Sequence, residues 1–214
     1  MTPPKFARAI NQTAARMFEI DFDVDQLIRK AEAIGASADQ MPYAFSRALN
    51  MAMDDARDHL VNVTWPQHVT VRNEQFIRRL LTIKYSDKHD LEAEIFENKG
   101  AVRGDAHLKL HDQGGVKTAK GQFAIPTRNV TITSYGPRAD QKPSHLQKKV
   151  VIGNTLYAVM GRKHHTKLVP MYRLAKTVNQ PADVPFTSDF YQVISGRIDA
   201  YFMPALALAM ATAR

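Results

Sequence analysis

The amino-acid sequence predicts an α+β fold, with an antiparallel sheet of about five to six strands packed against N-terminal helices and a long C-terminal helix. Apolar residues recur with a helical period before Leu81 and after Asp189, and they alternate with polar residues in several segments between these points. The charge is uneven as well, because residues 99–149 hold ten Lys and Arg against three Asp and contribute +7 to the net charge of +8. With its glycine pair and few large apolar side chains, this stretch predicts an extended basic loop or arm.

Two helices are expected near the N-terminus. Asp23 and Gln26 form a helix-start pattern before an apolar stripe, and Gly35 ends this first helix. The second helix starts near Asp39 with a proline in its first turn and runs to Leu60. One of its faces carries Ala44, Ala48, Ala52 and Ala56. This small-residue face predicts close packing in the core.

A short helix and a hairpin follow. Trp65 and the proline after it are expected to lie beyond the end of the second helix. Asn73 is the expected cap of a helix over residues 74–81. Alternation of apolar and polar residues then predicts a hairpin over residues 81–95, with a polar link between its strands.

Four more strands and a closing helix are expected in the remaining chain. One strand covers residues 130–134, and a tight hairpin turns at Gly153 and Asn154, which take positive φ at little cost. Another strand covers residues 168–174, and Pro170 predicts that it lies at a sheet edge. The closing helix begins near Asp189.

The C-terminal end is strongly apolar. Pro204 is expected to kink the closing helix, and the residues beyond it must be covered by the fold itself or by another molecule. The run FMPALALAMA spans ten residues, which is fewer than the roughly 20 that cross a bilayer. The sequence therefore predicts no contact with a membrane.

The domain organisation follows from length and patterning. We expect residues 1–40 to be an N-terminal extension with one helix, and residues 41–214 to form a single α+β domain with a basic insertion at about 99–149. The chain has no cysteine, so neither a disulfide nor a thiolate metal site can stabilise it. The stability must come from packing or from association with copies or partners.

Catalytic and metal-binding signatures are weak. His107 and His111 have helical spacing, and His164 and His165 are adjacent, but no carboxylate or cysteine completes a ligand set. An acidic cluster could be drawn as a nuclease-like metal site, although helix capping and solvation explain it better. Its members are Glu19, Asp21, Asp23 and Asp25. The sequence carries no nucleophile elbow and no phosphate-binding glycine loop. We predict no enzymatic activity, no metal and no cofactor.

The basic segment has three candidate environments: phosphate, the acidic surface of a neighbouring subunit, or water alone. Phe123 and Tyr135 are isolated in it, so stacking on nucleic-acid bases is not favoured. Nucleic acid is therefore the second choice as a partner.

Four segments of the chain carry a family resemblance. They are RALNMAMDDAR at residues 47–57, VTVRNEQFIRRLLTI at 69–83, LKLHDQGGVKTAKGQFAIPT at 108–127 and LVPMYRLAKTVNQPADVPFTSDF at 168–190. In this order they resemble the minor tail protein Z, or tail-completion, family of lambda-like long-tailed bacteriophages. The third segment, with its glycine pair before lysines and a short apolar stretch ending in proline, is the most distinctive. Residues 1–40 have no counterpart in the resemblance.

The resemblance implies a structural virion protein that completes the tail and joins it to the head at the neck. It implies a homo-oligomeric ring, a hexamer around the sixfold tail axis, in contact with the tail terminator, the tail tube or the head-tail connector. The protein would be found in the virion tail or neck, after assembly in the host cytoplasm. The alternative function is a basic DNA-binding module that contacts packaged or translocating phage DNA.

Two interaction surfaces are expected. In the basic segment the residues are Lys109, Gly114, Gly115, Lys117, Lys120, Phe123, Ile125 and Arg128. On the closing helix they are Phe202, Leu206 and Met210. The glycine pair is expected to be a hinge, and the basic segment is expected to become ordered only on assembly, when it pairs with an acidic surface.

Overall fold

The computed structural model describes residues 28–29, 32–33, 40–98, 100–101, 107–161 and 165–212. The fold is α+β, as the sequence predicts. The chain divides into two compact units. The helical unit comprises Met1–Val69, Asn73–Ala106 and Val184–Arg214, and the sheet unit comprises Thr70–Arg72 and His107–Asp183. The predicted first helix lies outside the described residues except at 28–29 and 32–33, which are helical.

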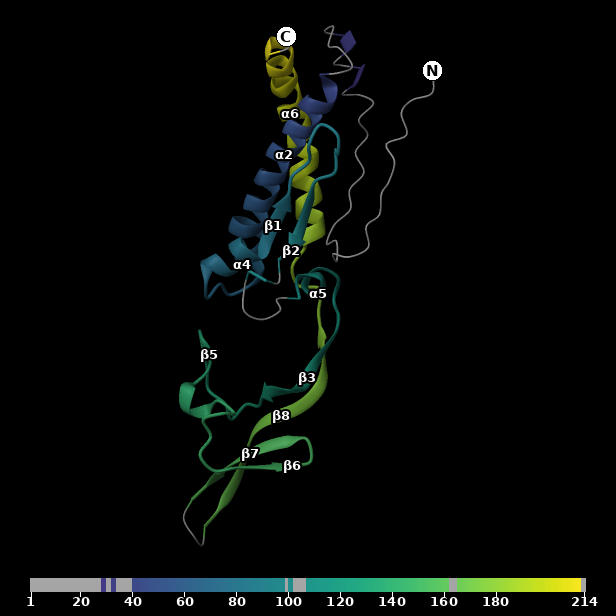
Figure 1. Ribbon diagram of the computed structural model, residues 1–214. Helices are drawn as coiled ribbons and strands as arrows, with labels where there is room; N and C mark the ends of the chain where they lie inside the picture. The colour runs from purple at the N-terminus through teal and green to yellow at the C-terminus, as the bar shows by residue number, and fades with distance from the viewer. Residues whose placement is uncertain are drawn as a thin grey trace. The chain divides into compact units, whose positions relative to one another are not determined.

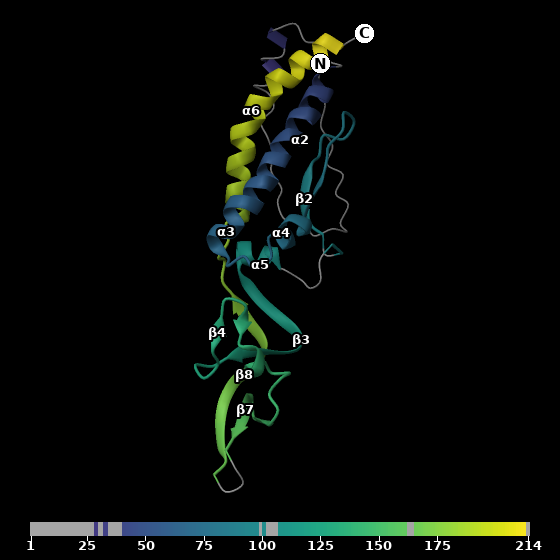
Figure 2. The same ribbon diagram turned by 90° about the vertical axis from the view of Figure 1, so that its left-hand side faces the viewer.

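The core of the helical unit is formed by helices α2 (Met41–His59) and α6 (Phe186–Thr212), which lie side by side (Figures 1 and 2). All four alanines of the predicted face are fully buried. Ala44 and Ala48 pack in one cluster with Phe202 and Leu206. Because alanine side chains are short, the two helix backbones come close enough for the larger residues of α6 to fill the space between them.

The helical path does not stop at the end of α2. It continues through a π-helical turn, η1 (Leu60–Thr64), into the short helix α3 (Trp65–His68). The prediction that Trp65 and Pro66 lie beyond the helix is therefore wrong. The Trp65 N–H bonds to the Leu60 carbonyl, five residues earlier. The wider turn leaves room for the ring of Pro66, which has no N–H to donate.

Helix α4 (Glu74–Leu80) and a hairpin complete the described part of this unit. The predicted cap is confirmed, because the Asn73 side-chain oxygen accepts a hydrogen bond from the Gln75 N–H at 3.0 Å. The predicted hairpin is confirmed as well: β1 (Leu81–Lys84) pairs antiparallel with β2 (Glu94–Glu97). The buried hydroxyl of Ser86, after β1, is held by the Ser46 and Asn50 side chains of α2.

Helix α6 continues through Pro204, and its axis bends toward the C-terminal end (Figure 2), as an internal proline favours. By length and composition α6 would also pass as a membrane-spanning helix. In the fold, however, it buries one side chain per turn along a single stripe: Phe190, Ile194, Ile198, Phe202 and Leu206. A stripe of this kind is typical of a core helix in a globular protein.

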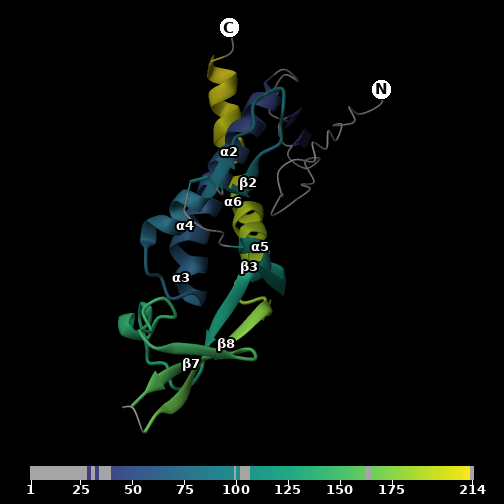
Figure 3. The same cartoon turned by 60° about the horizontal axis from the view of Figure 1, so that its bottom comes forward.

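The sheet unit is built on four antiparallel strands in the order β3-β8-β7-β6 (Figures 1 and 3). These strands are β3 (Gly115–Pro126), β6 (Lys149–Ile152), β7 (Thr155–Met160) and β8 (Lys167–Gln180). The predicted hairpin is confirmed, with Gly153 at a φ of 57° in its turn, whereas Asn154 does not adopt the predicted positive φ. A short helix, α5 (Leu108–Gln113), precedes β3.

The segment between β3 and β6 contains a small second sheet. Strands β4 (Ile132–Thr133) and β5 (Gly136–Pro137) pair antiparallel and are followed by the 3-10 turn η2 (Ala139–Gln141). The strand predicted at residues 130–134 is thus only two residues long. It belongs to this small sheet and not to the main one.

The basic segment is largely structured, contrary to the prediction of an extended loop. Strand β3 is 12 residues long and pairs with β8 at both of its ends, from Gly115 opposite Gln180 to Pro126 opposite Tyr172. The pairing is interrupted by a register shift between Thr118 and Phe123. Because β3 is an edge strand, β8 pairs with one side of its backbone only, on both sides of the register shift.

Strand β8 is central, so the prediction that Pro170 marks an edge strand is wrong for the strand as a whole. Pairing with β3 ends at Tyr172, and Pro170 pairs only with Tyr157 of β7. The proline therefore lies where β8 has a neighbouring strand on one side only, and its missing N–H breaks no pair with β3. The rule about proline holds locally, although the strand continues into the middle of the sheet.

Candidate interaction surfaces

Charge separates the two units. The sheet unit carries 14 Lys and Arg against three Asp, a net charge of +11, which leaves −3 for the helical unit. The excess positive charge predicted for residues 99–149 is therefore part of a larger basic unit. A field of this kind attracts acidic surfaces and phosphate alike, so charge by itself does not select the partner.

One face of the four-stranded sheet is covered. Leu156, Ala158 and Tyr172 point to this inner face and pack with Val130 from the segment between β3 and β6. The same segment is tied to the sheet by hydrogen bonds, because the Tyr172 hydroxyl donates to the Gln141 carbonyl at 2.7 Å and the Thr127 hydroxyl donates to the Pro170 carbonyl at 2.7 Å. The inner face is the core of the sheet unit.

A β-bulge in β8 decides which residues reach the opposite face. Leu156 is paired with Tyr172 and the next β7 residue, Tyr157, with Pro170, so Met171 is the extra residue. Met171 and Tyr172 are consecutive, yet both are 1% exposed and belong to the same core cluster. Simple alternation would place Tyr172 and Pro170 on the same face. The bulge moves Pro170, and Leu168 beyond it, to the outer face.

We call the opposite surface the outer sheet face. Its residues follow from the strand register and alternation: Phe123, Ile125, Val150, Ile152, Thr155, Tyr157, Val159, Leu168, Pro170, Arg173 and Ala175. Ile152 is 52% exposed and Leu168 is 43% exposed. Arg173 is exposed and lies in the row that joins Ile125 on β3 to Ile152 on β6. An apolar sheet face around one arginine has the composition of a protein contact surface.

Of the residues predicted in the basic segment, Phe123 and Ile125 lie on the outer sheet face and are half-buried. Lys109 lies in α5, Arg128 follows β3, and Lys117 and Lys120 lie at or near the register shift. The structure therefore brings together the apolar members of the predicted set, but not its cations. The outer-face residues of β6, β7 and β8 were not among the predicted interaction residues, because the pairing that brings these strands beside β3 joins segments far apart in the sequence.

The glycine pair shapes the turn from α5 into β3. Gly114 and Gly115 have φ values of 70° and 141°, in a region that other residues avoid. The Gly114 N–H bonds to the Leu110 carbonyl at 2.9 Å, and a Cβ at Gly114 would lie 3.2 Å from the backbone nitrogen of Ala182. These contacts hold the turn at the position where the sequence predicts a hinge.

The predicted surface on the closing helix is wrong for two of its three residues. Phe202 and Leu206 are 0% exposed because they face α2, and the Phe202 ring lies 4.5 Å from that of Phe45. Met210 is half-buried and packs against the same cluster. Leu208, on the other side of α6, is exposed. The apolar end of the chain is thus covered in large part by its own fold.

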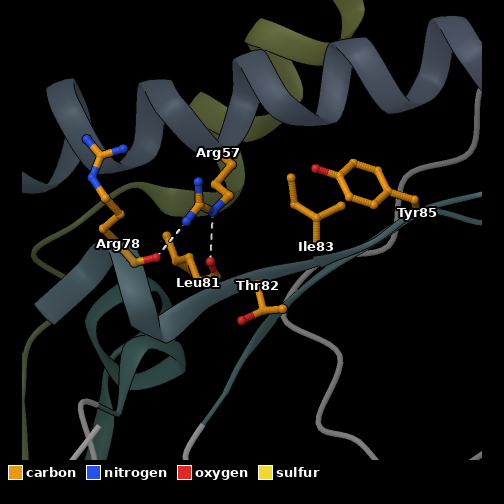
Figure 4. A pocket seen from close by; sticks show the side chains of 6 residues that line it. All are labelled: Arg57, Arg78, Leu81, Thr82, Ile83 and Tyr85. Carbon is orange, nitrogen blue, oxygen red and sulfur yellow. Dashed lines mark hydrogen bonds between the residues drawn. The ribbon is translucent and has the colours of Figure 1, made fainter. Parts of the chain in front are cut away.

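A shallow hollow of about 330 Å³ lies beside α2 and β1 (Figure 4). Its lining residues are Arg57, Arg78, Leu81, Thr82, Ile83 and Tyr85. The Arg57 guanidinium donates to the carbonyls of Leu81 at 2.8 Å and Arg78 at 2.6 Å. Arg57 thereby caps the C-terminal end of α4, which carries partial negative charge. We assign this arginine a structural role.

The exposed side of α2 forms a second surface. It consists of Tyr43, Arg47, Met51, Asp54 and Asp58, which recur every three or four residues and are all exposed. We call this surface the α2 stripe. The Tyr85 hydroxyl donates to the Asp54 carboxylate at 2.6 Å, and this hydrogen bond raises the pKa of Tyr85. The spacing of three or four residues is a sequence signal for this surface, because it places all five side chains on one side of a helix.

The histidines and acidic residues considered as metal ligands do not form a ligand set in the described part of the chain. His111 lies 2.7 Å from the Asp183 carboxylate, which joins α5 to the chain after β8. In the described part of the chain there is no group of three His, Cys, Asp or Glu that could hold a metal ion. The acidic cluster at residues 19–25 and His164 lie outside the described residues.

Comparison with known proteins adds no family assignment: no family model, no curated protein and no solved structure matches the chain. The resemblance to tail-completion proteins consequently stays a prediction from sequence.

Proposed function

We propose that this protein is a structural component of a tailed bacteriophage virion, which acts in tail completion or head-tail joining as a ring of identical copies at the head-proximal end of the tail. The observation that carries the proposal is the outer sheet face. Aromatic and aliphatic side chains surround one exposed arginine there, and buried aromatic residues with arginine are the groups that contribute most to protein-protein binding.

The size of the surface supports an assembly role in which further contacts take part. A stable interface buries about 800 Å² on each partner and involves roughly 20 to 30 residues a side. The outer sheet face has fewer residues than this, so it would form the centre of a larger contact. Ile132 and Tyr135, in the segment that covers the inner face, are exposed as well and offer a separate apolar contact.

The test is to locate the protein in the particle. Antibody raised against the recombinant chain is used for immunogold labelling of purified virions, with particles that lack the gene as the control. We expect label at the neck and, in the absence of the gene, tails that do not join heads. Purified virions that contain no copy of the chain would overturn the proposal.

A second function, DNA binding, is supported by the net charge of +11 on the sheet unit. If this unit neutralised about five phosphates, the logarithm of the binding constant would fall with the logarithm of salt concentration with a slope near −4.5. Retention on duplex DNA at several salt concentrations measures this slope. DNA would be favoured over protein as the partner by two results. The slope would be steep and would become smaller in Lys117→Ala and Lys120→Ala, and the affinity for DNA would be unchanged in Leu168→Asp.

A further inference from the structure

We propose that the outer sheet face of one copy docks on the α2 stripe of a second copy, so that the chains associate head to tail. The inference names the partner surface within the proposed ring and rests on the proposed function only for its biological setting. It is carried by two exposed surfaces whose chemistry is complementary, one on each unit.

The α2 stripe has the properties of a receiving surface. Met51 is 40% exposed at its centre, and Tyr85, joined to the stripe through Asp54, is 53% exposed. Asp58 has a 60% exposed side chain and forms long ion pairs with Arg57 and Arg78, at 3.8 and 3.9 Å. The stripe therefore combines apolar contact area with an exposed carboxylate, which a cation from a second copy would share with these two arginines.

The outer sheet face offers the matching groups. Ile152 and Leu168 supply exposed apolar area. Arg173 supplies the cation, and among the described residues it has no ion-pair partner. A guanidinium can donate two parallel hydrogen bonds to one carboxylate, which fixes the orientation of a contact as well as strengthening it. Arg173 against the stripe's carboxylates is the charge pair that we expect at the centre.

Charge also disfavours the alternative in which two outer sheet faces pair with each other. That arrangement would bring together two units of charge +11 and would oppose Arg173 to its own copy. In the helical unit, by contrast, the described residues include twelve Asp and Glu against eight Lys and Arg. Two whole copies, each with a net charge of +8, repel each other. At 0.1 to 0.15 M salt, however, charges more than about 8 to 10 Å apart are largely screened, so the attraction between the groups in direct contact outweighs this repulsion.

The consequence is an interface between two different surfaces. Such a heterologous contact leaves one surface of each kind unused at the ends of any open assembly, and it generates a ring when the rotation between copies closes. A contact of this kind has a specific signature: a copy defective in one surface can still use the other.

The experiment uses two complementary charge reversals in the full chain. Arg173→Glu damages the outer sheet face, and Asp58→Lys damages the α2 stripe. Sedimentation velocity over a concentration series compares each with the wild type, and Trp65 fluorescence and circular dichroism check folding. Arg128→Glu and Glu74→Lys are matched controls, because both residues are exposed and lie outside the two surfaces.

We expect the wild type and both controls to self-associate, and each reversal to weaken association by at least about tenfold. An equimolar mixture of the two reversals should recover association, because the outer sheet face of Asp58→Lys meets the intact α2 stripe of Arg173→Glu, and the two substituted surfaces carry swapped charges that also attract. If either reversal does not fold, Leu168→Asp or Met51→Lys replaces it. A wild type that stays monomeric up to its solubility limit, or a mixture without dimer, overturns the proposal.

Two further outcomes also decide the matter. Association that is lost in Arg173→Glu but kept in Asp58→Lys would show pairing of two outer sheet faces and would overturn the head-to-tail contact. A dimer in the mixture supports the contact even if the protein is absent from virions, since that absence overturns only the proposed function.

Discussion

The helical unit and the sheet unit bury their apolar residues in different ways. In the helical unit, α2 and α6 cover each other, and the largest side chains between them, such as Phe202, are fully buried. In the sheet unit the inner face is covered at its centre and leaves Val151 and Met160 exposed, and the outer face leaves Ile152 and Leu168 exposed. The helical unit therefore encloses its core between two helices, whereas the sheet unit has its core on one side of the sheet and a second apolar face on the other.

The two units also differ in net charge, which is −3 for the helical unit and +11 for the sheet unit. Opposite charge on two units of one chain provides a means for copies to recognise each other. Contact chemistry and charge thus point to the same division of roles. The following variants test the division, because each changes one unit and has a readout in that unit.

The largest effect is expected from Phe202→Ala in the helical unit. The substitution removes a fully buried ring between α2 and α6 and leaves a cavity, which costs about 3 to 5 kcal/mol in the free energy of unfolding. Urea unfolding followed by Trp65 fluorescence measures the loss, since Trp65 stacks on Phe186 in the same unit. Tyr191→Ala, at an exposed position of α6, is the control. A loss below about 1 kcal/mol at Phe202 would contradict the self-sufficient core.

Leu156→Ala makes the equivalent change in the sheet unit and should cost less. Leu156 is 6% exposed, and the core that it joins is covered on one side of the sheet only, so we expect about 2 kcal/mol, the low end for such substitutions. Hydrogen exchange of the β6-β7 hairpin reports the loss. Val151→Ala, at the exposed position opposite Leu156, is the control. If the cost equals that of Phe202→Ala, the two cores do not differ as described.

Asn73→Ala tests a local feature of the helical unit. It removes the oxygen that accepts the Gln75 N–H, which costs about 1 kcal/mol for a helix cap. Asn73→Asp keeps an acceptor and should retain most of the stability. Urea midpoints of the two variants decide the matter, and equal losses would show that the cap contributes nothing.

The smallest effect is expected from the pH dependence of Asp87, in the link between β1 and β2. Its carboxylate accepts hydrogen bonds from the backbone N–H groups of His89 and Asp90, at 2.7 and 2.9 Å, and these bonds lower the pKa of Asp87. A lowered pKa stabilises the fold above the ordinary pKa and ceases to do so as the pH falls through the lowered value.

The stability difference between wild type and Asp87→Asn should therefore be present at neutral pH and vanish in acid. Unfolding curves at a series of pH values measure it, and NMR titration of the carboxyl carbon measures the pKa itself. A difference that grows as the pH falls would contradict the assignment.

Much of the fold could be predicted because its signals are local. The cap at Asn73, the turn at Gly153 and the buried alanines of α2 each follow from a few neighbouring residues. The errors have local causes too. Pro66 was expected to end the helical path, but a π-turn accommodates it, and the lysines and glycines of the basic segment concealed strand β3.

The candidate surfaces were less accessible to prediction. Phe123 and Ile125 were selected for their apolar character, yet the residues beside them on β6, β7 and β8 come from distant parts of the chain. Phe202 and Leu206 were assigned to an assembly surface because a sequence does not reveal which molecule covers an apolar helix. Here α2 of the same chain covers them.

Local patterns predicted the α+β class, the helix cap at Asn73, both hairpins and the uneven charge, because periodicity, capping and turn chemistry act over a few residues, but they placed the start of α6 near Asp189 instead of at Phe186. Only the tertiary structure decided that β8 lies in the middle of the sheet, that its bulge places Leu168 beside Arg173 on the outer face, and that α2 buries the end of α6. These outcomes depend on pairing and packing between segments far apart in the chain. The free energy of such contacts depends on both partners, so it cannot be predicted from either segment alone.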